Sequence, residues 1–267
     1  MSEEASVSAR PRPVRIGVQV QPQQADYAQI RRAVAAVEEA GVDVVFNWDH
    51  FFPLYGNPEG KHFECWTMLA AWAEATERVE IGALVTCNSY RNPELLADMA
   101  RTVDHIGDGR LVLGIGSGWF ERDYTEYGYD FGTAGGRLDA LAEALPRIEA
   151  RWAALTPAPT RHIPVLIGGG GEKKTLRLVA RHGDIWHSFA DPETFTHKSA
   201  VLDDWCRREG RDPALIERSV GVEGDPASQG EDLLARGATL FTVNTGGPEY
   251  DLGQLRDWIA WRDDTNS

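Results

Sequence analysis

The feature of this sequence that most constrains its fold is an alternation of short apolar runs with longer amphipathic stretches along 267 residues. We interpret the apolar runs as strands at 16–20, 42–48, 79–86, 110–116, 163–169, 184–189, 218–222 and 239–245. Between them, apolar side chains recur every three or four residues, which indicates helices. Strands that alternate with helices are typical of a parallel sheet built from strand–helix–strand units.

Eight strand–helix units in a chain of this length predict an α/β fold, a closed (β/α)8 or TIM barrel. An open, doubly wound sheet is the alternative, but that fold usually has a glycine-rich turn directly after its first strand. Here the first strand is followed by Gln-Pro-Gln at 21–23, so we expect the barrel. We expect residues 14–267 to form one domain. Residues 1–13 are expected to be a disordered lead-in, because they contain no apolar segment of the kind found in signal peptides.

Charge and cysteine content narrow the range of partners and compartments. The formal net charge of −14 argues against binding to nucleic acid or to an anionic membrane, because no surface-wide positive field exists. No run of 18 apolar residues occurs, so no transmembrane helix is predicted. The three cysteines form no C-x-x-C pair, which favours the reducing cytoplasm. We expect a small-molecule substrate; the oligomeric state stays open, with a homodimer as one option.

Polar, glycine and aromatic residues gather where the predicted strands end. In a TIM barrel the carboxyl ends of the strands and the loops after them build the active site. Asp49 and His50 follow the second strand, TCNSYRNP (86–93) the third, GIGSGWFERDYTEYG (114–128) the fourth, and His187 lies in the sixth. This composition suits a large, flat ligand with polar edges. The alternative for the Asp-His pair is a turn cap followed by a core histidine.

The fifth strand leads into GGGGEKK (168–174). Glycines between a strand and a helix let backbone N–H groups approach an oxyanion, and the helix N-terminus adds a favourable dipole. Lys173, Lys174 and Arg177 add positive charge. The loop therefore predicts a phosphate site, with a flexible connector as the alternative. It is not a P-loop, because the pattern G-x-x-x-x-G-K-[ST] is absent. No metal site is expected, because histidines and carboxylates show no ligand spacing on one helix.

Four long stretches resemble the bacterial luciferase-like flavin and deazaflavin oxidoreductases, and most of all their actinobacterial F420-dependent branch. They are EEAGVDVVFNWDHFFPL (38–54), LVTCNSYRNPELLADMARTVD (84–104), GRLVLGIGSGWFERDYTEYG (109–128) and PVLIGGGGEKKTLRLVARHGDIW (164–186). The resemblance implies a TIM barrel that holds the deazaflavin F420, with FMN as the alternative cofactor. It implies an oxidoreductase passing a hydride between F420 and a small organic substrate. The alternatives are an FMN monooxygenase and a non-catalytic flavin- or F420-binding protein.

The resemblance also implies roles for individual residues. His50 is expected to act as acid or base, or to stabilise charge during hydride transfer, and Asp49 to contact the cofactor. A cis peptide bond without proline is expected near residues 83–84, behind the cofactor ring. Residues 117–118 are expected along the chain of the cofactor, and residues 169–172 at its phosphate. The full set of expected cofactor-binding residues is Asp49, Ala83, Leu84, Thr86, Ser117, Gly118, Gly169, Gly170, Gly171 and Glu172.

Two positions depart from the pattern of the F420 dehydrogenases. Several of those enzymes carry a tryptophan four residues after the histidine, where this chain has Leu54. They also carry a glutamate directly after the glycine that matches Gly118, where this chain has Trp119. That glutamate is a proton donor in those enzymes, so its replacement puts dehydrogenation of alcohols or sugar phosphates in doubt. We expect Trp119 and His187 to contact the substrate, with Trp119 stacking on or shielding an apolar one.

Overall fold

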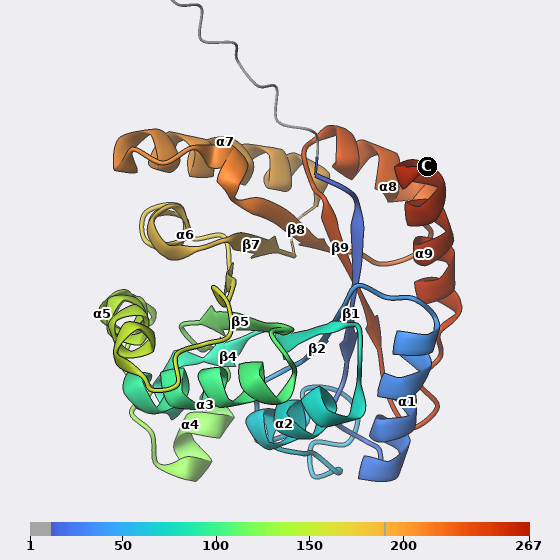
Figure 1. The fold of residues 1–267 in the computed structure, drawn as a ribbon, viewed down its shortest axis with the longest axis horizontal. Helices are drawn as coiled ribbons and strands as arrows, with labels where there is room; N and C mark the ends of the chain where they lie inside the picture. Colours follow the sequence, from blue (N-terminus) through green and yellow to red (C-terminus); the bar gives the residue numbers. More distant parts are fainter. Residues whose placement is uncertain (1–11, 190) are drawn as a thin grey trace, which may run out of the picture.

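A parallel β-barrel lies at the centre of the computed structural model, which describes residues 12–189 and 191–267 (Figure 1). The predicted lead-in lies almost entirely outside the described residues. The described strands are β1 (Arg15–Val20), β2 (Val44–Asn47), β3 (Glu80–Ala83), β4 (Thr86–Cys87), β5 (Leu111–Gly116), β6 (Val165–Gly168), β7 (Ile185–Ser188), β8 (Glu217–Gly221) and β9 (Leu240–Thr245). Both β3 and β4 pair with β5, so these nine segments make eight barrel strands.

The strand pairing closes the sheet into a ring. β1 pairs in parallel with β2 on one side and with β9 on the other, and β3 pairs with both β2 and β5. The predicted α/β TIM barrel is therefore confirmed. Each predicted strand begins and ends within two residues of an observed one, except that the third is divided. The division lies at Leu84-Val85, whose peptide bond is cis without proline, one bond after the expected position.

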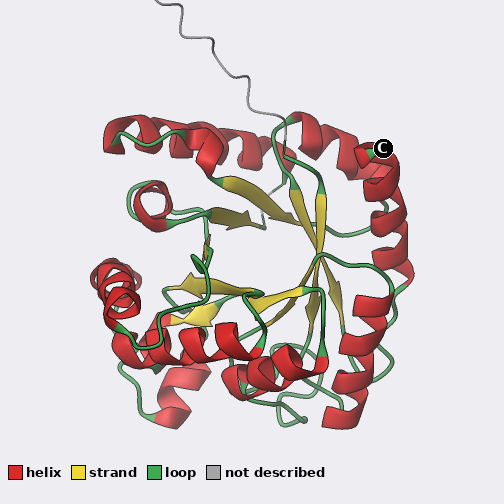
Figure 2. Ribbon diagram, viewed as in Figure 1, coloured by secondary structure: helices red, strands yellow, loops and turns green. Residues whose placement is uncertain are grey.

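Helices form the outer layer around the strands (Figure 2). They are α1 (Tyr27–Glu39), α2 (Cys65–Ala75), α3 (Pro93–Ile106), α4 (Glu121–Tyr127), α5 (Ala134–Ala154), α6 (Thr175–His182), α7 (Pro192–Glu209), α8 (Pro226–Ala235) and α9 (Gly253–Asn266), with short 3-10 turns η1 (Asn88–Tyr90) and η2 (Pro213–Leu215). Asn92 and Asp191 cap α3 and α7 through side-chain bonds, each with proline at the first helical position. None of the described helices has the length and apolar character needed to cross a membrane.

The strand pattern did not reveal a helix in the segment after β5. The sequence of 117–135 reads as a long polar and aromatic loop, but in the structure it contains α4. This helix has acidic residues Glu121 and Asp123 in its first turn and ends at Gly128, which adopts the left-handed conformation with φ of 72°. Both features are ordinary helix signals. The helix is only seven residues long, so no apolar period could develop that would mark it in the sequence.

The interior of the barrel is filled by side chains and is not a channel. An apolar cluster inside the ring consists of Val44, Phe46, Leu84, Val112, Leu166, Ile185 and Leu240, with Val85 packed against it. Phe46 fits there because Gly17 and Gly82 have no side chains: a Cβ added to either would lie 3.2–3.3 Å from its ring. The filled interior leaves the carboxyl ends of the strands as the end of the barrel where a ligand can bind.

Candidate active site

The central pair of the site is His50, directly after β2, and Asp123, in the first turn of α4. Nδ1 of His50 lies 2.7 Å from Oδ2 of Asp123, whose side chain is fully buried. The same carboxylate accepts hydrogen bonds from the Tyr90 hydroxyl at 2.9 Å and from the Phe51 backbone N–H at 3.0 Å. Three donors therefore fix the carboxylate, and the carboxylate fixes the plane of the imidazole ring.

This arrangement selects which ring nitrogen of His50 faces a ligand. When neutral, the ring donates its Nδ1–H to Asp123, which leaves Nε2 available. Among the described residues none hydrogen-bonds to Nε2. Burial and the neighbouring Cys87 and Asp123 raise the pKa of Tyr90 above its usual value, so its hydroxyl stays protonated and acts as a donor. An imidazole oriented by a buried carboxylate is suited to accept or donate a proton at Nε2.

Aromatic rings enclose His50. The ring centroids of Trp48, Trp119 and Phe120 lie 6.2, 5.7 and 5.5 Å from that of the imidazole, each approaching edge to face. The His50 side chain is 11% exposed, whereas Trp119 is 63% exposed. Trp119 therefore stands at the boundary between the site and solvent, with part of its surface on His50. Aromatic walls of this kind exclude water from the polar atom they surround.

Asp49, next to His50 in the sequence, is held by a different set of partners. Its carboxylate is buried and receives two hydrogen bonds from Arg91, at 2.6 and 3.0 Å, and one from the Cys87 backbone N–H at 3.0 Å. Arg91 also pairs with Glu64 at 2.6 Å. Burial disfavours the charge of Arg91, but Asp49 outweighs it and raises the pKa of the guanidinium. These donors fix the Asp49 carboxylate, which thereby connects the loops after β2 and β4. Its contact with a cofactor stays a prediction.

The segment between β3 and β4 forms a bulge across the top of the barrel. Val85 projects over β5 and β6, where a Cβ on Gly116 or Gly168 would lie 2.8 or 3.1 Å from its side chain. Leu84 belongs to the cluster inside the barrel, and its carbonyl accepts a bond of 2.7 Å from the Gln19 side chain. Ala83 and Thr86 flank the bulge and are buried within strands. The bulge thus gives the site an apolar floor.

Ser117 and Gly118 connect this floor to α4. Gly118 has φ of 81°, and a Cβ there would overlap the Tyr124 hydroxyl and the Cys87 sulfur. Its carbonyl accepts a hydrogen bond of 3.1 Å from Arg137 on α5. Both residues are partly exposed. Only glycine fits this turn, because the backbone is left-handed there and the side chains of Tyr124 and Cys87 pack against it.

The glycine loop between β6 and α6 is open to solvent on several residues and has free backbone donors. Gly169 has φ of 115°, and the N–H groups of 170–173 donate to no other described residue. Two of the lysine and arginine side chains that were expected to add positive charge for a phosphate form ion pairs with acidic residues. Lys174 pairs with Asp139 at 2.5 Å and Arg177 with Glu209 at 2.8 Å, both toward neighbouring helices.

Glu172 in the same loop turns its side chain toward α7. It pairs with Lys198 at 2.6 Å and with His197 at 3.0 Å, and these partners lower the pKa of its carboxyl group. The free donors of the loop are therefore its backbone amides, with Lys198 as the nearest cation to Gly170, whose added Cβ would lie 3.8 Å from Cε of Lys198. An oxyanion would be held here by backbone N–H groups at the start of α6.

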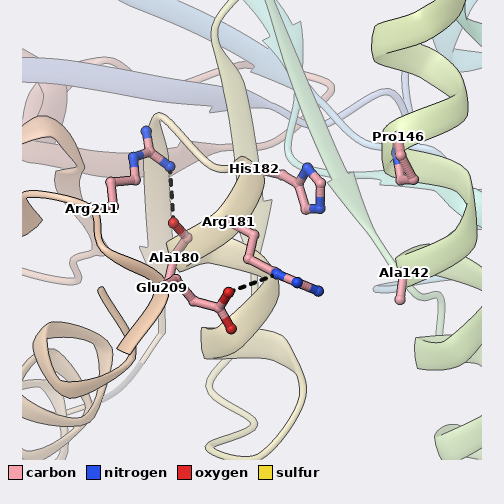
Figure 3. A pocket seen from close by; sticks show the side chains of 7 residues that line it. All are labelled: Ala142, Pro146, Ala180, Arg181, His182, Glu209 and Arg211. Atoms are coloured by element: carbon pink, nitrogen blue, oxygen red, sulfur yellow. Dashed lines mark hydrogen bonds and ion pairs between the residues drawn. The ribbon is translucent and has the colours of Figure 1, made fainter. Parts of the chain in front are cut away.

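A separate hollow of about 510 Å³ lies on the outside of the barrel (Figure 3). Its walls come from α5, α6 and the C-terminal end of α7, with Pro146, His182 and Glu209 among the lining residues. The C-terminal end of α6 is at the opposite end of the barrel from the strand ends that carry His50. Arg181 and His182 are paired with Glu209 and Glu149. We therefore place the site at the strand ends and not in this hollow.

Sequence reasoning missed the residues that organise the site. Asp123, Tyr90 and Arg91 were quoted within longer stretches, but none was singled out. Asp123 is 73 positions from His50, and Arg91 is 42 from Asp49. A carboxylate in the first turn of a helix after a strand end was the available signal for Asp123. It could not identify the partner, because that depends on which strand ends are neighbours around the barrel.

The sequence matches the luciferase-like monooxygenases over residues 12–229. The chain belongs to this family. An F420-dependent glucose-6-phosphate dehydrogenase of Microbacterium testaceum is 30% identical over 220 residues, 74% of this chain and 64% of that protein. An uncharacterized protein of Mycobacterium tuberculosis is 28% identical over 192 residues, 66% of this chain and 65% of that protein. The chain therefore matches slightly less than two thirds of the length of each of these relatives.

Two solved structures have the same fold. An F420-dependent secondary alcohol dehydrogenase in complex with an F420-acetone adduct has a TM-score of 0.84 at 18% identity, covering 96% of this chain and 100% of that one. A coenzyme F420-dependent tetrahydromethanopterin reductase from Methanopyrus kandleri has a TM-score of 0.74 at 15% identity, covering 90% and 96%. At these identities the likeness concerns the barrel and not the substrate.

Proposed function

We propose that this protein is an oxidoreductase that binds F420 at the carboxyl end of the barrel and transfers a hydride between F420 and a small organic substrate. The observation that carries the proposal is the free Nε2 of His50, backed by Asp123 and placed at the end of β2 beside the bulge at Leu84-Val85. Membership of the luciferase-like family and relatives named F420-dependent support it.

The residues present fit such a cofactor. A flat ring needs an apolar floor, which Val85 supplies. The partly exposed backbone at Ser117 and Gly118 would pass along the cofactor. A phosphate needs donors, and the unbonded N–H groups of 170–173 lie at the N-terminus of α6. When bound, F420 supplies a carbon that gives or accepts a hydride.

The protein itself contributes in two ways: it transfers a proton to or from the substrate, and it excludes water from the site. A carbonyl substrate that receives a hydride at carbon needs one proton at oxygen, and the reverse reaction releases that proton. His50 is placed to supply or accept it at Nε2, with Asp123 stabilising the charged ring. Trp48, Trp119 and Phe120 keep water from this nitrogen. Asp49 and Arg91 hold the loops that carry these groups in register.

The walls of the site favour an apolar or aromatic substrate over a charged one. Trp119 replaces the glutamate of related dehydrogenases and exposes much of its ring beside His50. An exposed indole offers a stacking face but no proton. We infer that His50 is the proton-transferring group and that the substrate is a small organic molecule with an apolar or aromatic body. A small naphthoquinone, which accepts a hydride and a proton, is a suitable test acceptor.

The cofactor assignment makes a direct prediction. We expect the protein to bind F420 with a Kd in the micromolar range or below, and FMN much more weakly. Fluorescence titration of the purified protein with each cofactor measures both constants. Equal or tighter binding of FMN would favour the monooxygenase alternative. Tight F420 binding without turnover of the naphthoquinone, or of other uncharged acceptors, would favour the non-catalytic alternative.

The glycine loop makes a second prediction. Gly170 does not require a left-handed backbone, and a Cβ added there has ordinary contacts, the nearest at 3.8 Å. Gly170→Ala should therefore fold with an unchanged melting temperature. If the cofactor phosphate lies against this backbone, the methyl group should weaken F420 binding about tenfold or more, the equivalent of roughly 1.4 kcal/mol or more. Gly253→Ala, at the exposed start of α9, is the matched control. Unchanged affinity for Gly170→Ala would make the loop a connector.

A further inference from the structure

His187 is a buried histidine that the proposed reaction does not use. It lies on β7 two residues after Ile185, which belongs to the cluster inside the barrel, so its side chain points to the same interior. Its side chain is fully buried. Nδ1 lies 2.8 Å from the Ser219 hydroxyl on the neighbouring strand β8. Nε2 has no hydrogen-bond partner among the described residues.

Burial sets the charge of this ring. It lowers the pKa of His187 to about 3, so the imidazole is neutral under ordinary conditions. A neutral imidazole carries one donor and one acceptor nitrogen. With Nδ1 engaged by Ser219, Nε2 offers one hydrogen bond to an uncharged group. Buried polar atoms normally have a partner, and those without one call for an explanation.

One side chain, Phe189, covers the side of His187 that faces Gly221. Gly221 on β8 has no side chain, and a Cβ there would lie 3.8 Å from Nε2 of His187. The Phe189 ring occupies this place: it would lie 2.8 Å from the same Cβ, and its centroid is 4.5 Å from that of His187. Phe189 is nevertheless 70% exposed. It covers His187 without being packed into the core.

The position also adjoins the floor of the site. His187 pairs in register with Gly168, and Gly168 faces Val85 of the bulge. On the other side, Gly221 pairs with Thr242, whose buried hydroxyl also has no partner among the described residues. Two unpartnered polar atoms therefore lie on β7 and β9, the two strands that flank β8. A ligand with only an apolar ring would leave both atoms without a hydrogen-bond partner.

We propose that Nε2 of His187 hydrogen-bonds an uncharged hydroxyl, carbonyl or ring N–H of the ligand held at the barrel's carboxyl end, and that this ligand displaces Phe189. The proposal rests on the proposed function, because it places a ligand over the bulge. The group that bonds to Nε2 can belong to either of two molecules: it is a polar edge of the cofactor ring, or it is the polar group of the substrate. His187 is then a binding residue that selects a ligand with a polar group at that depth.

The test compares two variants with a control. His187→Leu combined with Ser219→Ala removes the imidazole and its partner together, so no new unpaired hydroxyl is left. The melting temperature of the apoprotein should not fall below that of the wild type, because a buried unsatisfied polar atom has been removed. His187→Gln keeps a hydrogen-bonding side chain and should recover part of any lost binding. His162→Leu, an exposed histidine outside the site, is the control.

Two measurements on these variants distinguish the two sources. If the cofactor ring is the partner, the double variant binds F420 about 3- to 10-fold more weakly by fluorescence titration, the loss expected for one hydrogen bond. If the substrate is the partner, F420 binding is unchanged and KM for the naphthoquinone rises by a similar factor. A folded double variant with both constants within twofold of the wild type would overturn the proposal.

Failure of the proposed function gives a different pattern. If the wild type binds FMN and not F420, the proposed function fails, and the same variants titrated with FMN test His187 on its own. Weaker FMN binding by the double variant would then support the role of His187. Binding of neither cofactor by the wild type would overturn both proposals.

Discussion

His50→Ala is expected to lower turnover of the naphthoquinone by F420H2 about 10²–10⁴-fold, the usual contribution of a general acid or base. The affinity for F420 should change far less, because the role proposed for Nε2 is at the reacting centre, whereas the proposed phosphate donors are backbone N–H groups of the glycine loop. Stopped-flow measurement of hydride transfer, combined with fluorescence titration of F420, separates the two effects.

Two further variants distinguish a catalytic role of His50 from a purely structural one. Asp123→Asn keeps the shape of the side chain but loses the charge that orients and stabilises the His50 ring, so it should also lower turnover. His62→Ala removes a neighbouring histidine that accepts a 3.0 Å hydrogen bond from Trp48 and whose pKa burial lowers to about 4. It should lower the melting temperature and leave turnover closer to normal. A His50→Ala protein with normal turnover and a lowered melting temperature would remove His50 from catalysis.

Arg91→Met should lower the free energy of unfolding by about 3–5 kcal/mol, the range for removing one partner of a buried ion pair. The reason is that Asp49, whose side chain is fully buried, then keeps only the Cys87 N–H as a partner. Denaturant unfolding measures the change. The matched control is Arg147→Met, because Arg147 makes a similar two-bond pair with Glu94 on the surface, where both side chains are at least 40% exposed. That pair is worth about 0–1 kcal/mol.

The loss in Arg91→Met should depend on pH in a defined direction. Burial raises the pKa of Asp49, and Arg91 opposes this effect. Without Arg91 the folded protein holds a proton on Asp49 more tightly than the unfolded chain does. A group with a raised pKa in the folded state costs stability as pH rises above its unfolded value, which is about 3.9 for Asp. The deficit should therefore be larger at pH 7 than at pH 4. An equal deficit at both values would show that Asp49 does not carry the effect.

The family resemblance implies that Asp49 contacts the cofactor, and this stays a prediction. In the structure the neighbouring residues point to different partners: Asp49 to Arg91 and the Cys87 N–H, His50 to Asp123. Adjacent positions at a strand end diverge in this way because successive side chains leave the backbone on opposite sides.

The sequence by itself determined the barrel and indicated which end of it to propose as the site. Eight apolar runs of strand length, each followed by an amphipathic stretch, bury both faces of the strands only as a parallel sheet covered by helices. Polar and glycine residues at the strand ends, such as Asp49-His50 and the run at 168–171, then indicated the candidate site without knowledge of any contact. The apolar runs recur along the chain, and the strand-end residues directly follow them, so both features can be recognised from the sequence alone.

The tertiary structure decided which side chains act together. Asp123 reaches His50 because β5 lies next to β3 around the barrel and α4 folds back over the end of β2. The sequence analysis already expected His187 to contact the substrate, but its hydrogen bond to Ser219 and the Phe189 ring beside it are known only from the structure. Neither the His50–Asp123 pair nor the contacts of His187 can be recognised from residue spacing or composition, because other helices and strands separate the partners in the sequence. The partners come close because the strands close into a barrel, and the sequence does not show which strand ends then become neighbours.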